Sequence, residues 1–179
     1  MLPLSPTIGV IGLGYVGLPL AVQLATRYRV TGLDTNHRRA KELQGGNDRT
    51  LQVSSDRLRS VQDALIITTD EGLLAGMDLV IVTVPTPVTT HKTPDFGPLE
   101  SGARTAGRAI RQGSTVVFES TVYPGCTEEY CVPIIEQVSG LKLNTGFFAG
   151  YSPERINPGD QVHTIDKVTK VTSGSTPEA

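Results

Sequence analysis

The stretch from Thr7 to Asp34 constrains the fold more than any other part of this 179-residue chain. It begins with a run dominated by β-branched residues, Ile8–Ile11, which is typical of a strand buried on both faces. The run breaks at the sequence Gly12-Leu13-Gly14-Tyr15-Val16-Gly17, which has the form G-x-G-x-x-G, and an apolar helical pattern follows. A second apolar run, Val30–Leu33, then ends in Asp34. This order of segments predicts a βαβ unit with two parallel strands.

Each part of this unit has a physical role in binding a dinucleotide. Gly12 permits the tight turn out of the strand, Gly14 lets the backbone approach a pyrophosphate, and Gly17 lets the helix pack close to the sheet. The N–H groups and the positive dipole end of that helix face the phosphates. Asp34, 22 positions after Gly12, can accept hydrogen bonds from both ribose hydroxyls and would repel a 2′-phosphate. The sequence therefore predicts NAD rather than NADP as cofactor. A glycine-rich turn in an unrelated α/β domain is the alternative, and the ordered set of signals argues against it.

The composition excludes several classes of function. The chain has 16 Lys and Arg residues against 18 Asp and Glu, a formal charge of −2, and no basic block suits nucleic acid or a membrane surface. The apolar runs fall far short of the ~20 residues of a membrane span. Residues 1–6 lack the basic residues and apolar core of a signal peptide. We therefore expect one cytoplasmic domain, with a real core because 38% of the residues are hydrophobic.

The two cysteines, Cys126 and Cys131, do not suggest a metal site. They lie five positions apart with no histidine close by in the sequence, which is not a zinc pattern. Five residues also place two side chains on different faces of an α-helix, which disfavours a disulfide. We expect reduced, structural thiols and no bound metal.

Strand and helix patterns alternate through the rest of the chain. This alternation predicts an α/β fold, a Rossmann doubly wound parallel sheet with strand order 3-2-1-4-5-6. The further expected strands are Leu65–Thr69, Leu79–Val84, Thr115–Glu119, Phe147–Tyr151 and Val168–Thr172, and the further expected helices are Asn36–Leu43, Leu99–Ile110 and Thr127–Ser139.

Two residues outside the glycine loop are also candidates for the cofactor site. Thr86 lies between two prolines just after an expected strand, at the edge where open α/β sheets bind ligands. Arg39 follows the ribose-binding acid closely enough to stack on or flank an adenine. Its alternative interpretation, a solvated surface arginine, is equally compatible with the spacing.

Five stretches together resemble the N-terminal part of the UDP-glucose/GDP-mannose dehydrogenase family, and they cover nearly the whole chain. They are IGLGYVGLPLA (Ile11–Ala21), VPTP (Val84–Pro87), PDFGPL (Pro94–Leu99), ESTVYPGCTEE (Glu119–Glu129) and GYSPERINPGD (Gly150–Asp160). The last two resemble the branch acting on UDP-N-acetyl-hexosamines in capsule and surface polysaccharide synthesis, above all the UDP-N-acetylglucosamine 6-dehydrogenases. The resemblance implies that residues 1–179 are the NAD-binding Rossmann domain of a longer enzyme, without its central helical and C-terminal substrate domains.

The resemblance also implies an activity. Members of the family oxidise the C6 alcohol of a UDP-sugar to a carboxylate with two NAD⁺, through a covalent intermediate on a cysteine of the substrate domain. Neither Cys126 nor Cys131 lies in the sequence context of that nucleophile, so this chain alone should be inactive. The family also implies a homodimer of the full-length protein, formed largely through the central helices. The alternatives are another Rossmann dehydrogenase, of the 3-hydroxyacyl-CoA or 6-phosphogluconate type, and a non-catalytic NAD-sensing module.

The resemblance assigns cofactor contacts to residues of the glycine loop and of the strand ends. The amides of Tyr15 and Val16 should lie near the pyrophosphate. Threonines at the ends of strands should line the cofactor cleft or help at the start of the following helix; they are Thr86, Thr121 and Thr127.

The resemblance assigns the catalytic and substrate contacts to two later loops. Glu154, with Thr121, resembles the pair that holds the water for thioester hydrolysis, which fits a carboxylate accepting a proton at a cleft mouth. An ordinary loop carboxylate is the alternative for Glu154. Arg155 and Ile156 correspond to positions that touch the nucleotide sugar, although Arg155 could instead pair with Asp160 at the surface.

The fold adds a geometric expectation for three of these residues. Thr86, Thr121 and Glu154 each follow an expected parallel strand, so all three should lie at the sheet edge that carries the glycine loop. Thr121 and Glu154 should follow neighbouring strands, about 5 Å apart. Their side-chain oxygens should then be about 3 to 6 Å apart, directly or through one water.

Overall fold

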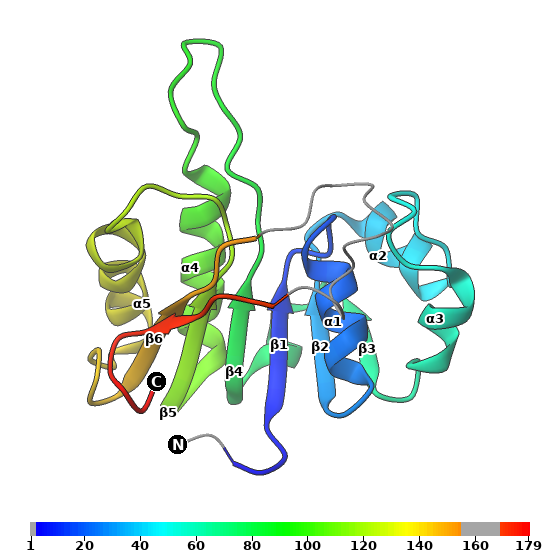
Figure 1. The fold of residues 1–179 in the computed structure, drawn as a ribbon, viewed down its shortest axis with the longest axis horizontal. Coiled ribbons are helices and arrows are strands. Elements are labelled where there is room, and N and C mark those ends of the chain that lie inside the picture. Colours follow the sequence, from blue (N-terminus) through cyan, green and yellow to red (C-terminus); the bar gives the residue numbers. More distant parts are fainter. Residues whose placement is uncertain (1–2, 155–168) are drawn as a thin grey trace.

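The computed structural model describes residues 3–154 and 169–179, and within them seven strands form one sheet (Figure 1). The strand order is β3-β2-β1-β4-β5-β6-β7. The first six strands run parallel, and β7 pairs antiparallel with β6. The predicted Rossmann order 3-2-1-4-5-6 is confirmed, with β7 added at the edge. The strands are β1 (Thr7–Ile11), β2 (Arg29–Leu33), β3 (Leu65–Thr68), β4 (Met77–Val82), β5 (Ile110–Phe118), β6 (Phe147–Tyr151) and β7 (Ser173–Gly174).

Helices connect the parallel strands. They are α1 (Gly17–Ala25), α2 (His37–Gln44), α3 (Ser55–Ser60), α4 (Gly97–Ala109) and α5 (Val132–Ser139), with a 3₁₀ turn η1 (Glu71–Leu74) and a π-helical turn η2 (Thr127–Cys131). Local chemistry sets several of the ends. The Asn36 side chain accepts from the Arg38 and Arg39 amides in the first turn of α2, and the Ser54 side chain accepts from the Arg57 amide in α3. Gly140, with φ of 72°, ends α5 in the left-handed conformation that glycine adopts without strain.

The core consists of two apolar clusters, one for each face of the sheet. In β1, Ile8 and Val10 join the cluster that includes α1 and α3, whereas Ile11 joins the cluster that includes α4 and α5. Val80 and Val82 of β4 likewise belong to the α4 and α5 cluster. Because alternate side chains of each central strand enter opposite clusters, both faces are covered and the ligand can approach only from an edge.

The helix that follows β5 begins differently from the expected α-helix. Its first turn, η2, is π-helical, with the Val132 amide donating to the Thr127 carbonyl five residues earlier. The expectation that Cys126 and Cys131 lie on different faces of an α-helix assumed α-helical geometry, which is wrong here. A π-helical turn brings residues about five positions apart close together. Both thiols are free and buried, as expected for structural cysteines.

The last expected strand is misplaced. The structure puts β7 at Ser173–Gly174, after the predicted segment Val168–Thr172, of which Val168 lies outside the described residues. Val171 is half exposed, and pairing begins only where Ser173 meets Tyr151 of β6. Such an edge strand is defined by its hydrogen-bonding partner and not by its own apolar pattern.

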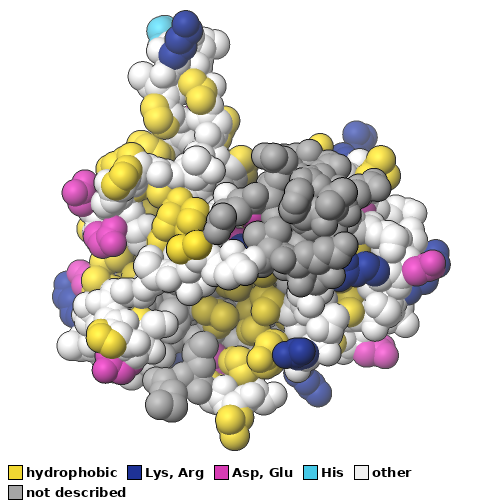
Figure 2. All heavy atoms as spheres, in the orientation of Figure 1, with side chains coloured by type: hydrophobic (Ala, Val, Ile, Leu, Met, Phe, Trp, Pro, Cys, Tyr) yellow, Lys and Arg dark blue, Asp and Glu magenta, His cyan; other side chains and the backbone are white. Residues whose placement is uncertain are grey.

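The segment between β4 and α4 forms an arm, residues 84–96, that projects from one end of the sheet (Figure 1). Val88 bridges to Pro94 near its middle, and the Thr89 amide donates to the Thr93 carbonyl at 2.8 Å. His91 and Lys92 lie in the turn of the arm, where their amides donate to Thr89. Figure 2 shows a basic side chain and a histidine at the tip of the arm. Among the described residues, no helix is long and apolar enough to cross a bilayer.

Candidate functional site

A cleft of about 400 Å³ opens where β1, β2 and β4 end. Its walls come from the glycine loop, from the residues just after β2 and β4, and from the start of α4. The lining includes Gly12, Leu13, Gly14, Asp34, Thr35, Thr83, Val84, Pro85, Pro98 and Ser101. The cleft therefore lies at the strand-order reversal between β1 and β4, which is where open α/β sheets bind ligands.

The backbone N–H and C=O groups of Gly12 and Leu13, the first two residues of the glycine loop, all form hydrogen bonds. The Gly12 amide donates to the Leu33 carbonyl at 2.8 Å, and the Leu13 amide donates to Asp34 Oδ2 at 3.0 Å. The Gly12 carbonyl accepts from Thr83 Oγ1 at 2.7 Å, and the Leu13 carbonyl accepts from Arg39 Nε at 3.0 Å. These four bonds hold the loop in one conformation, a prerequisite for a preorganised anion site.

The three glycines of the loop differ in what surrounds them. Gly12 has φ of 93°, in the left-handed region that favours glycine. A Cβ at Gly17 would lie 1.9 Å from the Gly12 carbonyl oxygen, so only glycine fits at the start of α1. A Cβ at Gly14 would meet none of the described atoms within 4 Å, which leaves the space over this residue open to a ligand. The Gly12 turn and the close packing at Gly17 are thus physical requirements of the fold.

Asp34 is held by backbone amides in a position to bind a second partner. Its Oδ2 accepts from Leu13, and its Oδ1 accepts from the Asn36 amide at 2.9 Å. An ionised carboxylate has about four acceptor sites, so each oxygen can still accept from a ribose hydroxyl. The side chain is part-buried at the rim of the cleft.

Arg39 occupies a different environment from the solvated surface position, and that interpretation is wrong. The residue is only 6% exposed. Besides the Leu13 carbonyl, its guanidinium lies 3.0 Å from Glu42 Oε1 and 2.7 Å from Asp48 Oδ1. Burial works against ionisation of Asp48, but hydrogen bonds from Thr50 and Arg39 outweigh it and lower the pKa of that carboxyl. Arg39 therefore stabilises the glycine loop through its hydrogen bond to the Leu13 carbonyl. A contact between Arg39 and the adenine stays a prediction.

Hydrogen bonds join the loops that follow β4 and β5. Thr86 Oγ1 donates to the Thr121 carbonyl at 2.7 Å, and Ser120 Oγ donates to the Val84 carbonyl at 2.6 Å. Glu154 follows β6, the parallel neighbour of β5. The expectation that Thr86, Thr121 and Glu154 share one edge of the sheet with the glycine loop is confirmed. The separation of the Thr121 and Glu154 side chains stays a prediction.

A buried charge cluster, which the sequence did not predict, lies at the same edge. Glu119, directly after β5, is 5% exposed, and its Oε2 lies 2.6 Å from Lys170 Nζ. The same ammonium is 3.8 Å from Glu154 Oε2. Burial raises the pKa of Glu119, only partly offset by Lys170, and the negative charge of Glu154 adds to the rise. No local sequence signal links Lys170 to Glu119, because the two are 51 positions apart.

The remaining predicted residues are placed as follows. Tyr15 is 54% exposed at the glycine loop, beside Val16 at the start of α1. Thr127 is buried and lines a separate hollow of about 270 Å³, together with Tyr123 and Tyr151. Arg155 and Ile156 lie outside the described residues.

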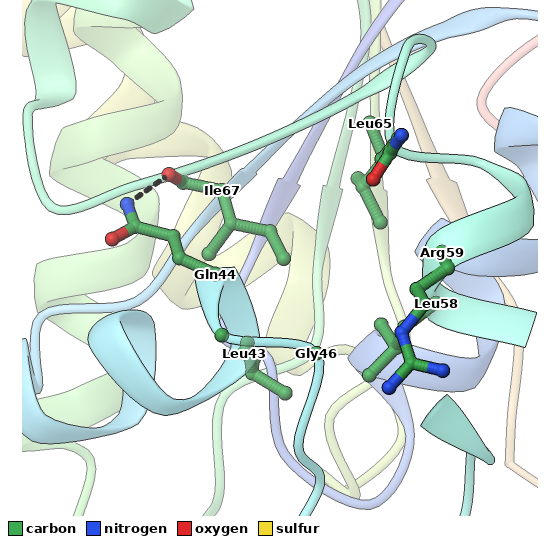
Figure 3. A pocket seen from close by; sticks show the side chains of 9 residues that line it. Leu43, Gln44, Gly46, Leu58, Arg59, Leu65 and Ile67 are labelled. Atoms are coloured by element: carbon green, nitrogen blue, oxygen red, sulfur yellow. Dashed lines mark hydrogen bonds between the residues drawn. The ribbon is translucent and has the colours of Figure 1, made fainter. Parts of the chain in front are cut away.

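Another hollow, of about 350 Å³, lies between α2, α3 and the edge strand β3 (Figure 3). Leu43, Leu58 and Ile67 supply its apolar surface, and Gln44 Nε2 donates to the Ile67 carbonyl at 2.8 Å. That bond satisfies one carbonyl of an edge strand. Among the residues that the structure describes, the hollow shares no lining residue with the 400 Å³ cleft.

A doubly wound sheet, a glycine-rich loop between β1 and α1, and an acid at the end of β2 define a dinucleotide-binding domain of the Rossmann class. Comparison with known proteins specifies it further. The chain belongs to the UDP-glucose/GDP-mannose dehydrogenase family, whose NAD binding domain matches residues 6–179.

Individual relatives agree with this assignment. A UDP-N-acetyl-D-glucosamine 6-dehydrogenase from Pseudomonas aeruginosa is 50% identical over 171 residues, 96% of this chain and 40% of that protein. Protein CapL from Staphylococcus aureus is 47% identical, over 98% of this chain and 41% of its own length. A solved UDP-D-ManNAc dehydrogenase from Pyrococcus horikoshii superimposes with a TM-score of 0.87 at 30% identity, over 96% of this chain and 42% of that one. The chain thus spans about two fifths of the length of these relatives.

Proposed function

We propose that this chain is the NAD-binding part of an NAD-dependent nucleotide-sugar 6-dehydrogenase. The substrate is a UDP-sugar, a UDP-N-acetyl-hexosamine, whose C6 alcohol is oxidised to the uronic acid for capsule or surface polysaccharide synthesis. The observation that supports this best is the 50% identity to a UDP-N-acetyl-D-glucosamine 6-dehydrogenase over 96% of the chain. In this proposal residues 1–179 are one domain of a longer, homodimeric cytoplasmic protein.

The cofactor roles follow from the geometry of the cleft. Asp34 accepts from the adenosine ribose, and the loop Gly12–Gly17 receives the pyrophosphate, with the amides of Tyr15 and Val16 at the start of α1. The joined loops that carry Thr86 and Thr121 border the nicotinamide end. When bound there, NAD would supply the hydride acceptor for oxidation at C6 of the sugar. The protein groups bind and orient the cofactor so that this transfer can occur.

The hydrolytic role falls on the end of β6. Glu154, with Thr121, positions the water that hydrolyses the thioester and accepts its proton. Lys170 Nζ lies 3.8 Å from Glu154 Oε2. Arg155 and Ile156 contact the nucleotide sugar in this proposal, the arginine suiting an anionic diphosphate. Thr127, at the start of η2, contributes to cofactor binding in this proposal.

Two alternatives are less well supported. Another Rossmann dehydrogenase, of the 3-hydroxyacyl-CoA or 6-phosphogluconate type, would share the glycine loop but not the stretches Glu119–Glu129 and Gly150–Asp160. A non-catalytic NAD-sensing module would have no need of an acid at the end of β6, next to the loop of Thr121.

Two measurements test the proposal. Titration calorimetry should show that the purified chain binds NAD. Incubated with NAD and UDP-N-acetylglucosamine, the chain should form no NADH, because it lacks the thiol that holds the intermediate. The longer gene product should form two NADH for each sugar. Absence of NAD binding refutes the cofactor role, and NADH formation by the 179-residue chain refutes the proposed division of the chemistry. A longer product that binds NAD but oxidises no UDP-sugar favours the sensing module.

A further inference from the structure

Thr83, the first residue after β4, lies against the glycine loop although it belongs to none of the motifs recognised in the sequence. Its Oγ1 donates to the Gly12 carbonyl at 2.7 Å and lies 3.1 Å from the Ile11 carbonyl. Its backbone amide also donates to Ile11, at 2.9 Å, continuing the pairing of β4 with β1. The hydroxyl is therefore held at a fixed place under the loop by the sheet itself.

Thr83 fixes one end of a peptide unit whose other end is fixed by Asp34. The carbonyl of the Gly12–Leu13 peptide accepts from Thr83, and the amide of the same peptide donates to Asp34 at 3.0 Å. A trans peptide is planar and its N–H and C=O point in opposite directions, so two such bonds set the orientation of the plane. Gly12, with φ of 93°, has wide conformational freedom, and these bonds remove it.

The Thr83 hydroxyl also lies where α1 approaches the loop. A Cβ at Gly17 would lie 2.3 Å from Thr83 Oγ1 and 1.9 Å from the Gly12 oxygen. The Thr83 hydroxyl and the Gly12 carbonyl therefore both pack closely against Gly17, the first residue of α1. A shift of the Gly12 carbonyl would shift the start of α1 relative to β1, and with it the amides that face a bound phosphate.

We propose that Thr83 is a positioning residue for the cofactor: its hydroxyl fixes the Gly12–Leu13 peptide and so sets the phosphate-binding geometry at the start of α1. This inference rests on the proposed NAD binding. It concerns the diphosphate of the ligand, whereas the proposed function assigns the adenosine ribose to Asp34.

The test compares Thr83→Val, which keeps the shape but removes the hydroxyl, with Thr83→Ser, which keeps the hydroxyl. Binding of NAD, ADP and adenosine to the 179-residue chain is measured by calorimetry and by NMR shift titration. The temperature is kept well below the midpoint of thermal unfolding of each variant. Thr83→Val should weaken the binding of NAD and of ADP about tenfold, because the part-buried Gly12 carbonyl loses its donor and the peptide plane is then held only at its Asp34 end. Adenosine should change by less than about twofold, and Thr83→Ser should bind all three within about twofold of the unaltered chain.

Thr115→Val is the matched control, because Thr115 is a buried threonine of β5. It should leave all three affinities unchanged. If Thr83→Val does not fold, Thr83→Ala replaces it with the same expectations.

The possible results separate the two hypotheses. If the unaltered chain does not bind NAD, the proposed function is refuted and this inference with it. If the unaltered chain binds NAD and Thr83→Val binds it equally well, only the inference is overturned. Equal weakening of adenosine and NAD overturns it too, because a general loss of structure would explain that result. Failure of Thr83→Ser to restore binding shows that the hydroxyl is not the cause.

Discussion

Replacing Gly17 by alanine should damage both the fold and NAD binding. The new Cβ would lie 1.9 Å from the Gly12 carbonyl oxygen and 2.3 Å from Thr83 Oγ1. Favourable carbon–oxygen contacts begin at about 3.3 Å, so the start of α1 and the loop must separate by more than about 1 Å. Overpacking of this kind costs about 1–3 kcal/mol, occasionally more. A displacement of more than about 1 Å takes the amides at the start of α1 out of hydrogen-bonding distance of a bound pyrophosphate, and we expect NAD affinity to fall at least about tenfold.

Gly14→Ala is the matched control in the same loop. Gly14 does not have a positive φ, and its Cβ would meet none of the described atoms within 4 Å. The alanine should therefore leave the free energy of unfolding unchanged or raise it by about 0.4–1 kcal/mol, because it restricts the unfolded chain. Its methyl group occupies the space through which the pyrophosphate approaches, so NAD should still bind at least about tenfold more weakly.

Urea unfolding followed by circular dichroism gives the free energies, and calorimetry gives the NAD affinities. Gly17→Ala should lower both the free energy of unfolding and the NAD affinity, whereas Gly14→Ala should lower only the NAD affinity. A Gly17→Ala chain with the unfolding midpoint and the NAD affinity of the unaltered chain would refute the steric argument. A Gly14→Ala chain with unchanged NAD affinity would show that the ligand does not approach this part of the loop.

Three further predictions concern charge and thiols. NADP should bind at least about tenfold (about 1.4 kcal/mol) more weakly than NAD in a calorimetric titration. Asp34→Ala should reduce this difference in affinity. Equal affinities of the unaltered chain for NAD and NADP would contradict the role of Asp34. Burial raises the pKa of Cys126 and raises that of Cys131 to about 12, so at pH 8 both thiols should react with a disulfide reagent only after unfolding, and rapid labelling of the folded chain would contradict this. Asp48 has its pKa lowered in the fold, so its contribution to stability is present above the ordinary value of 3.8 and is lost as the pH falls through the folded pKa. Urea unfolding at pH 7 and pH 3 should show a smaller acid-induced loss for Asp48→Asn than for the unaltered chain, and an equal loss would refute this.

The sequence alone determined the architecture of this domain because its signals are local. The β-branched run before Gly12, the helical spacing after Gly17 and the acid at Asp34 predict a βαβ unit from contacts among neighbouring residues. The strand Phe147–Tyr151 was predicted with its observed bounds, since an apolar run between polar loops needs no distant partner to be recognised. Parallel strands joined by helices then leave few possible orders, and the predicted one was found.

The tertiary structure decided what holds the site in place, because those contacts join residues far apart in the sequence. Thr83 meets Gly12 across 71 positions, and Lys170 meets Glu119 across 51. Arg39 could be a surface or a buried residue by its spacing, and only the approach of Leu13 and Asp48 makes it a buried brace. Hydrophobic periodicity specifies which face of a segment is buried. It does not specify which polar atom on a neighbouring element satisfies a loop carbonyl, since that depends on the packing of the complete sheet.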